Sequence, residues 1–227
     1  LKARTGELIW DFQFTHHDVW DYDIAAQPNL ITVRRAGRDI PAVAQVTKQG
    51  FLFLLHRETG KPLFEVEERP VQQSALPGEK LSPTQPFPAA PPAFARTSIR
   101  PDEIADVSPE HRKFAEKIFR AYDAGGVFSA PSEKGVMVFP GNNGGADWGG
   151  GCYDPTSSLY FVSSSNLGMV MKMVPTQQSF PAYRMTGGGF LRTAWLWDYE
   201  TGIPLQAPPW GTLTAIDMNR GETRWQV

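Results

Sequence analysis

The chain has 227 residues, of which 41% are hydrophobic and 12% aromatic, so it can bury a substantial core. Its 22 basic and 24 acidic residues give a net charge of −2, which argues against the broad basic surface of a nucleic-acid-binding protein. Glycine (21 residues) and proline (20 residues) exceed the average usage, which indicates turns and loops rather than a helical bundle. The single cysteine, Cys152, excludes an intrachain disulfide.

The chain opens on Leu1 and Lys2 without an initiator methionine, from which we expect a piece of a longer protein. A piece of this kind is expected to be inactive and prone to aggregation by itself, because half of its pocket would be missing and its outer sheet edges would lack their partners.

Short apolar runs with turn residues between them recur along the chain and predict a mainly antiparallel β protein. The predicted strands are Leu30–Val33, Ala42–Val46, Phe51–Leu55, Val136–Phe139, Leu159–Val162 and Met169–Val174.

A long insertion, from about residue 67 to 132, separates the third and fourth of these strands. It is rich in proline, as in Pro83–Pro88, which disfavours central sheet pairing because proline lacks the N–H donor. One helix is expected inside it at 109–123, where Ser108 suits the N-cap and Pro109 the first helical position.

A weak internal repeat combines a glycine turn with an aromatic residue four positions later. Gly6 precedes Trp10 and Gly221 precedes Trp225, while a degenerate copy pairs Gly60 with Phe64. Each copy is expected to be a hairpin whose aromatic residue docks on the neighbouring copy, as in a propeller or a solenoid; unrelated hairpins are the alternative. The first and last copies are incomplete, so the chain is expected to be one partial domain with truncated terminal blades.

The densest polar cluster is Thr15–Asp23, with the sequence THHDVWDYD. In an extended segment Asp21 and Asp23 would share one face with His17. Such carboxylates can act as a general base or as hard oxygen ligands for Ca²⁺ or Mg²⁺. The alternative is structural: Asp18, Asp21 and Asp23 would cap turns, and the histidines would bind backbone carbonyls.

This cluster resembles the active-site segment of the quinoprotein dehydrogenases, which carry pyrroloquinoline quinone (PQQ) in an eight-bladed β-propeller. The glycine-aromatic hairpins look like the tryptophan-docking motifs of that family. Further matches cover almost the whole chain, in the expected order, and are closest to the membrane-bound glucose dehydrogenase branch. They are Ala25–Leu30, Val46–Phe51, Leu55–Gly60, Ser82–Phe87, Val138–Asn142, Trp148–Gly150, Tyr153–Pro155 and Pro209–Gly211.

The resemblance implies an all-β fold, part of an eight-bladed propeller, and assigns roles to several residues. Asp21 corresponds to the catalytic base and is a possible metal ligand, with the other ligands of Ca²⁺ or Mg²⁺ expected upstream. Lys48 corresponds to the cation that contacts the quinone oxygens; an exposed turn lysine is the alternative. His17, Asp18 and Asp23 are expected to support the Asp21 loop.

Two tryptophans and one asparagine complete the predicted cofactor contacts. Trp20 and Trp148 either wall the cofactor or pack structurally. The family pattern expects an asparagine where this chain has Ser163, and Asn166, three residues later, is the substitute. The glycine runs Gly141–Gly145 and Gly187–Gly189 lack the context of a phosphate-binding loop and are expected to form turns.

The resemblance implies an oxidoreductase that oxidises a sugar or alcohol hydroxyl and passes electrons to a quinone or cytochrome, without a nucleic-acid partner. A periplasmic location, with or without a membrane anchor on an upstream segment, is also implied. The alternatives are an alcohol-type quinoprotein and a non-catalytic propeller of the outer-membrane assembly type. The carboxylate-rich cluster favours an enzyme.

Overall fold

The structure is a computed structural model that describes residues 1–177, 183–186 and 196–227; the predicted turn at Gly187–Gly189 lies outside these ranges. The strands are β1 (Asn29–Arg35), β2 (Arg38–Val46), β3 (Leu52–His56), β4 (Val66–Pro70), β5 (Thr84–Pro88), β6 (Val136–Val138), β7 (Gly151–Asp154), β8 (Leu159–Ser165), β9 (Met169–Pro175), β10 (Tyr183–Thr186), β11 (Gly211–Asp217) and β12 (Glu222–Gln226). The helices are the 3-10 turn η1 (Pro101–Glu103) and α1 (Pro109–Ala121).

Within the described residues, the strands form four antiparallel sheets, in the orders β1-β2-β3, β10-β9-β6, β12-β11-β8-β7 and β4-β5. Each of the six predicted strands coincides with an observed one, and the mainly antiparallel pairing is confirmed. No helix among the described residues is long and apolar enough to cross a membrane.

The repeated hairpins dock on one another through glycine and an aromatic ring. Gly60 has a φ of +69°, and a Cβ built there would lie 2.6 Å from the ring of Trp10. In the same way, Gly221 has a φ of +72° and faces the ring of Phe64 at 2.7 Å. The indole of Trp10 also donates a hydrogen bond of 3.0 Å to the carbonyl of Arg57. The aromatic residues of the first two copies therefore pack on the glycine turn of the next copy, as the repeat predicts.

The proline-rich segment contains regular structure. Pro86 and Pro88 lie in β5, which pairs only with β4, so the prolines remain outside a larger sheet. The predicted helix is confirmed as α1, with the Ser108 hydroxyl accepting the N–H of His111 at 3.2 Å.

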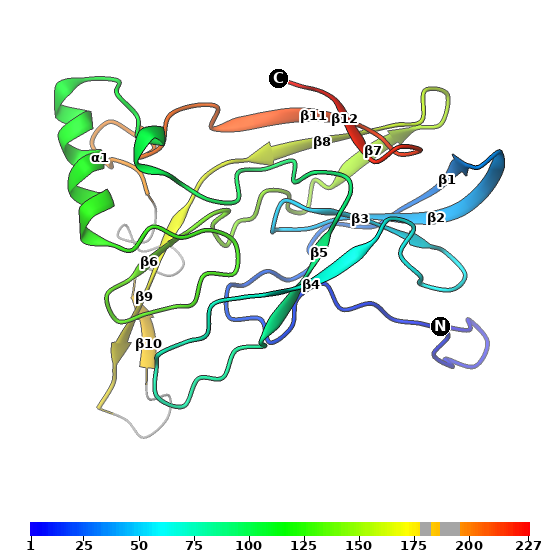
Figure 1. The fold of residues 1–227 in the computed structure, drawn as a ribbon, viewed down its shortest axis with the longest axis horizontal. Helices are drawn as coiled ribbons and strands as arrows, with labels where there is room; N and C mark the ends of the chain where they lie inside the picture. The colour runs from blue at the N-terminus through cyan, green and yellow to red at the C-terminus, as the bar shows by residue number, and fades with distance from the viewer. Residues whose placement is uncertain (178–182, 187–195) are drawn as a thin grey trace.

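In the part of the chain that the structure describes, three clusters of buried side chains connect these elements. The first lies between the β1-β2-β3 sheet and the β7-β8-β11 strands, and includes Leu54 and Ile216. The second joins the N-terminal segment, through Trp20, to β3, β6 and β9. The third packs α1 against the residues near Leu205, at the opposite end of the molecule from the β1-β2 hairpin (Figure 1). The second cluster anchors the polar segment Thr15–Asp23.

Replacement of Gly60 by alanine tests the docking. A Cβ at Gly60 is strained by the positive φ and also collides with Trp10, so we expect a loss of about 2–4 kcal/mol in the free energy of unfolding. Gly37→Ala is the matched control, since Gly37 has a φ of +75° with no atom within 4 Å of the added Cβ, and should lose only ~1 kcal/mol. Chemical denaturation of the full-length protein measures both, and equal losses would contradict the docking.

Candidate functional site

The segment Thr15–Asp23 forms a tight loop around the side chain of Asp18. The Asp18 carboxylate accepts hydrogen bonds from the backbone N–H groups of Trp20 (2.9 Å) and Tyr22 (2.7 Å). Burial raises the pKa of Asp18, and these two hydrogen bonds offset the rise only in part. Asp18 therefore acts as a turn cap, which is the structural role weighed from the sequence.

The loop is not extended, because His17 and Asp21 have left-handed backbones with φ values of 45° and 64°. His17 therefore leaves the face that it would share with the carboxylates of an extended segment. Its Nε2 lies 2.9 Å from a carboxylate oxygen of Glu79 in the β4-β5 connection, not near a backbone carbonyl. The common face predicted for His17, Asp21 and Asp23 was wrong for His17, while Asp21 and Asp23 do share one partner.

That partner is Lys48, in the turn between β2 and β3. Its Nζ lies 2.5 Å from Oδ1 of Asp23, 3.4 Å from Oδ2 of Asp21 and 2.9 Å from the carbonyl oxygen of Asp21. Only 8% of the Lys48 side chain is exposed, compared with 64% for Asp21 and 60% for Asp23. Lys48 is thus a turn lysine, but a buried one whose charge is held by the Asp21 loop.

The electrostatic balance favours a charged ammonium. Burial lowers the pKa of Lys48, but the hydrogen bond to Asp23 and the charge of Asp21 outweigh this effect, so the pKa is raised. The result is a buried, charged ammonium that contacts two carboxylates whose side chains are mostly exposed.

A glycine-rich loop packs against Lys48 from the other side. The N–H of Gly145 donates to the Lys48 carbonyl at 2.7 Å, and a Cβ added to Gly144 would lie 2.6 Å from Cγ of Lys48. Gly144 has a φ of +79° and its N–H bonds to the carbonyl of Gly141, which confirms the predicted turn.

This loop also lines a depression of about 310 Å³. Its walls are Asn143–Asp147, Gly149, Gly150 and Ser163–Ser165. Ser163, which replaces the expected asparagine, lines the same depression as Gly144, and Gly144 packs against Lys48. Trp148 lies in the same loop and is 82% exposed.

A larger depression of about 780 Å³ lies between β1 and β7 and includes the exposed Cys152. It contains none of the predicted site residues, and it follows the outer strands of two sheets. The chemistry assembled around Lys48, rather than the larger volume, identifies the candidate site.

Two other predicted cofactor residues are buried in the protein. Trp20 is 1% exposed, and its indole N–H donates to the carbonyl of Ser129 at 2.7 Å, so the structure gives it a packing role. Asn166 is 4% exposed; its amide oxygen accepts the N–H of Arg96 at 2.7 Å and its amide nitrogen donates to the Pro209 carbonyl at 3.0 Å. Both polar ends of Asn166 therefore already have protein partners.

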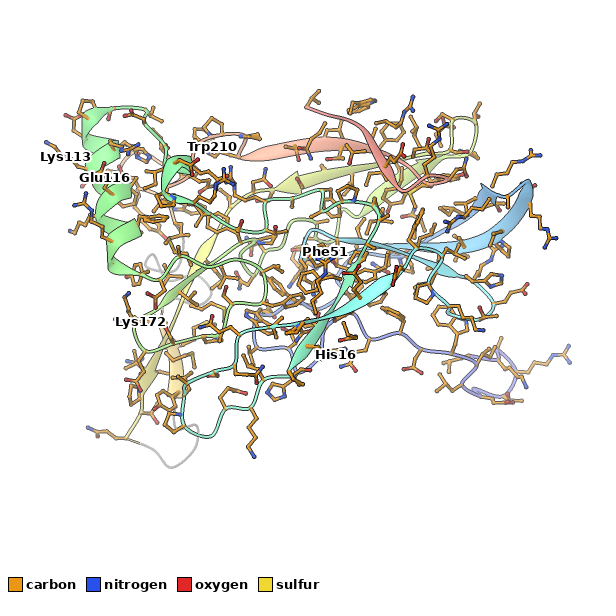
Figure 2. All side chains as sticks on the ribbon, viewed as in Figure 1. His16, Phe51, Lys113, Glu116, Lys172 and Trp210 are labelled. Carbon is orange, nitrogen blue, oxygen red and sulfur yellow. The ribbon has the colours of Figure 1, made fainter. Side chains whose placement is uncertain are left out.

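Sequence reasoning gave no role to Gln85 and interpreted Gly144 only as part of a turn. Gln85, in β5, is fully buried and binds both backbone groups of His16, which Figure 2 labels below the β4-β5 hairpin. Gln85 belongs to the Ser82–Phe87 match to the family. The match marks the segment, but the sequence does not show that Gln85 contacts His16.

The described residues contain no group of three or more histidine, cysteine, aspartate or glutamate side chains suited to hold a metal ion. Asp21 and Asp23 offer carboxylate oxygens, but both also bind Lys48.

The whole chain, residues 1–227, matches the family model for the β-propeller domain of PQQ-dependent glucose, ethanol and alcohol dehydrogenases. It is 34% identical to the glycerol dehydrogenase large subunit of Gluconobacter oxydans, 32% to the quinoprotein glucose dehydrogenase of the same organism, and 31% to the quinate/shikimate dehydrogenase (quinone) of Acinetobacter baylyi. Each match covers 100% of this chain and 34%, 31% and 30% of these relatives. The chain thus spans about a third of their length.

The fold agrees with solved structures. The quinohemoprotein alcohol dehydrogenase of Comamonas testosteroni superposes with a TM-score of 0.56 at 18% identity, over 100% of this chain and 28% of that one. The quinohemoprotein alcohol dehydrogenase ADHIIG of Pseudomonas putida gives a TM-score of 0.55 at 19% identity, again over 100% of this chain and 28% of that one. With the family model matched from end to end, this chain belongs to the PQQ-dependent dehydrogenases and is part of their β-propeller domain.

Proposed function

We propose that this chain supplies the base and the cation of the active site in a PQQ-dependent dehydrogenase that oxidises a hydroxyl of a sugar, polyol or alcohol. The observation that carries the proposal is the buried ammonium of Lys48 between two exposed carboxylates, beside a glycine-rich loop. A purely structural propeller has no need to bury a cation in this way, because the desolvation of the charge is costly.

The residues present suit PQQ, a planar quinone that carries carboxylates. Lys48 would hold its oxygens, and the glycines at 144–145 and 149–150 would let the backbone of this loop approach the ring. Trp148, exposed in that loop, is the proposed aromatic wall, and Asn166 and Trp20 are proposed to support the pocket from behind. Bound PQQ supplies the two-electron acceptor for the hydride of the substrate carbon.

Asp21 is the proposed base, and its contact with Lys48 suggests how it is released for that task. An ammonium has three N–H donors, and three acceptors use them, of which Oδ2 of Asp21 at 3.4 Å is the most distant. A cofactor oxygen that took this third position would leave the Asp21 carboxylate free to accept the proton of a substrate hydroxyl. Asp23 and the Asp21 carbonyl would keep Lys48 in place.

A divalent cation, Ca²⁺ or Mg²⁺, is proposed at the same site, with Asp21 as one oxygen ligand and the remaining ligands outside this chain. Electrons would leave to a quinone or a cytochrome. The relatives named for glycerol, glucose and quinate suggest polyhydroxylated substrates, and the glucose-like branch is the proposed specificity. We also propose that the enzyme is periplasmic, with or without a membrane anchor on another segment. The residues of this chain would form a single partial propeller domain.

Asp21→Asn in the full-length enzyme tests the base. Asparagine keeps the shape but cannot accept the hydroxyl proton, so we expect kcat to fall about 10²- to 10⁴-fold while PQQ uptake, followed by absorbance titration, is retained. Asp11→Asn, at an exposed aspartate outside the loop, should leave kcat unchanged. Normal turnover of Asp21→Asn would contradict the assignment.

Lys48→Met tests the cation. Methionine fills the same space without the charge, and the loss of a charge-assisted hydrogen bond should weaken PQQ binding about 10- to 100-fold. Lys113→Met, on the outer face of α1 (Figure 2), is the control and should bind PQQ normally. If neither variant nor the parent binds PQQ in the presence of Ca²⁺ or Mg²⁺, the non-catalytic propeller would be favoured.

A further inference from the structure

The loop that carries Asp21 is held by one fully buried amide from the β4-β5 hairpin. Nε2 of Gln85 donates to the carbonyl of His16 at 2.7 Å, and Oε1 of Gln85 accepts the N–H of His16 at 2.8 Å. The two residues are 69 positions apart, and the Gln85 side chain is 0% exposed. Gln85 thus binds the backbone of His16 through both polar ends of its side chain.

The support behind Gln85 is rigid. Gln85 lies in β5, where its register partner is Arg69 of β4. The ring of Phe87, two residues further, packs against the rings of Phe51 (5.4 Å between centroids) and Phe128 (5.5 Å). A side chain on a strand anchored by such packing can hold a neighbouring loop with little freedom.

The position of His16 determines that of Asp21, because the two limbs of the loop are tied together. The hydroxyl of Thr15 donates to the Tyr22 carbonyl at 3.4 Å, and the carboxylate of Asp18 accepts the Tyr22 N–H at 2.7 Å. Asp21 lies directly before Tyr22, with a left-handed φ of 64°. A shift of the limb at His16 would therefore be passed to Asp21.

Polar side chains also connect the Asp21 loop to the β4-β5 hairpin. Nε2 of His16 lies 3.0 Å from Oε1 of Glu68 in β4, and Thr84 of β5 donates to the other oxygen of Glu68 at 2.7 Å. These groups are partly exposed, so each contributes little to stability. The buried bonds of Gln85 carry the restraint.

We propose that Gln85 is a positioning residue for the Asp21 base: its amide holds the His16 peptide so that the Asp21 carboxylate lies at the correct place beside Lys48. This inference rests on the proposed function, in which Asp21 takes the substrate proton. It assigns the β4-β5 hairpin of the proline-rich segment a part in catalysis.

The chemistry of the amide makes the proposal testable. Methionine has nearly the shape of glutamine but neither donates nor accepts strongly, so Gln85→Met leaves both His16 groups unpartnered. A glutamate at this position accepts the His16 N–H when ionised but cannot donate to the carbonyl. When protonated it can do both, and burial favours the protonated form.

Gln85→Met in the full-length enzyme, loaded with PQQ and Ca²⁺, should lower kcat on the order of 10- to 100-fold with KM and PQQ affinity unchanged. Hydrogen exchange in a peptide covering residues 13–23 should accelerate about tenfold. Gln73→Met is the matched control: Gln73 is exposed in the same segment and donates to the carbonyls of Val71 and Ser82, not to the Asp21 loop. It should change neither measurement.

Two further variants separate positioning from general structural support. If Gln85 acts through Asp21, the Asp21→Asn, Gln85→Met double variant should be no slower than Asp21→Asn alone. For Gln85→Glu, kcat relative to the parent enzyme should rise as the pH is lowered, because the protonated acid restores both hydrogen bonds. An additive double variant, or a Gln85→Glu enzyme that is as slow at low pH as Gln85→Met, would overturn the proposal.

The outcomes also distinguish the positioning role of Gln85 from the proposed role of Asp21 as the base. Asp21→Asn with normal turnover contradicts the base assignment itself. Inactive Asp21→Asn together with fully active Gln85→Met contradicts only the positioning role. A Gln85→Met enzyme that loses PQQ affinity as strongly as kcat would show general support of the fold and would also contradict that role.

Discussion

The docking of an aromatic ring on a left-handed glycine holds neighbouring blades together. At Gly60 and Gly221 the backbone has a positive φ and there is no Cβ. The rings of Trp10 and Phe64 therefore occupy the space that the Cβ of any other residue would need. Each contact joins one repeat to the next. The turns at the ends of the strands are thereby brought to defined places, and the turn that bears Lys48 meets loops from two other parts of the chain.

The candidate site combines a buried cation with exposed anions. The Lys48 ammonium tolerates its burial because Asp21 and Asp23 accept its hydrogen bonds, and the same bonds require the Asp21 loop to close over it. Closure depends on the cap by Asp18 and on the buried amide of Gln85, which come from the loop itself and from the β4-β5 hairpin. The site is therefore assembled from segments that are distant in sequence and that only the tertiary fold brings together.

Several features could be predicted from short stretches of the sequence. The apolar runs identified the strands because a strand in the core is marked by a short run of apolar residues between turn residues, and Ser108 with Pro109 identified the start of α1. The glycine-aromatic spacing predicted docking between the copies. The carboxylates of Thr15–Asp23, together with the family resemblance, pointed to the loop and to Lys48.

The sequence by itself thus determined the strands, the repeated hairpins, the family and the identity of the candidate base and cation. Only the tertiary structure decided that Lys48 is buried, that His17 turns away to Glu79 while Asp21 and Asp23 converge, and that Trp20 is in the core. It also revealed Gln85, whose partner is 69 residues away. The physical reason is that burial and the partner of a side chain are decided by contacts between distant segments, which residue spacing along one segment does not encode.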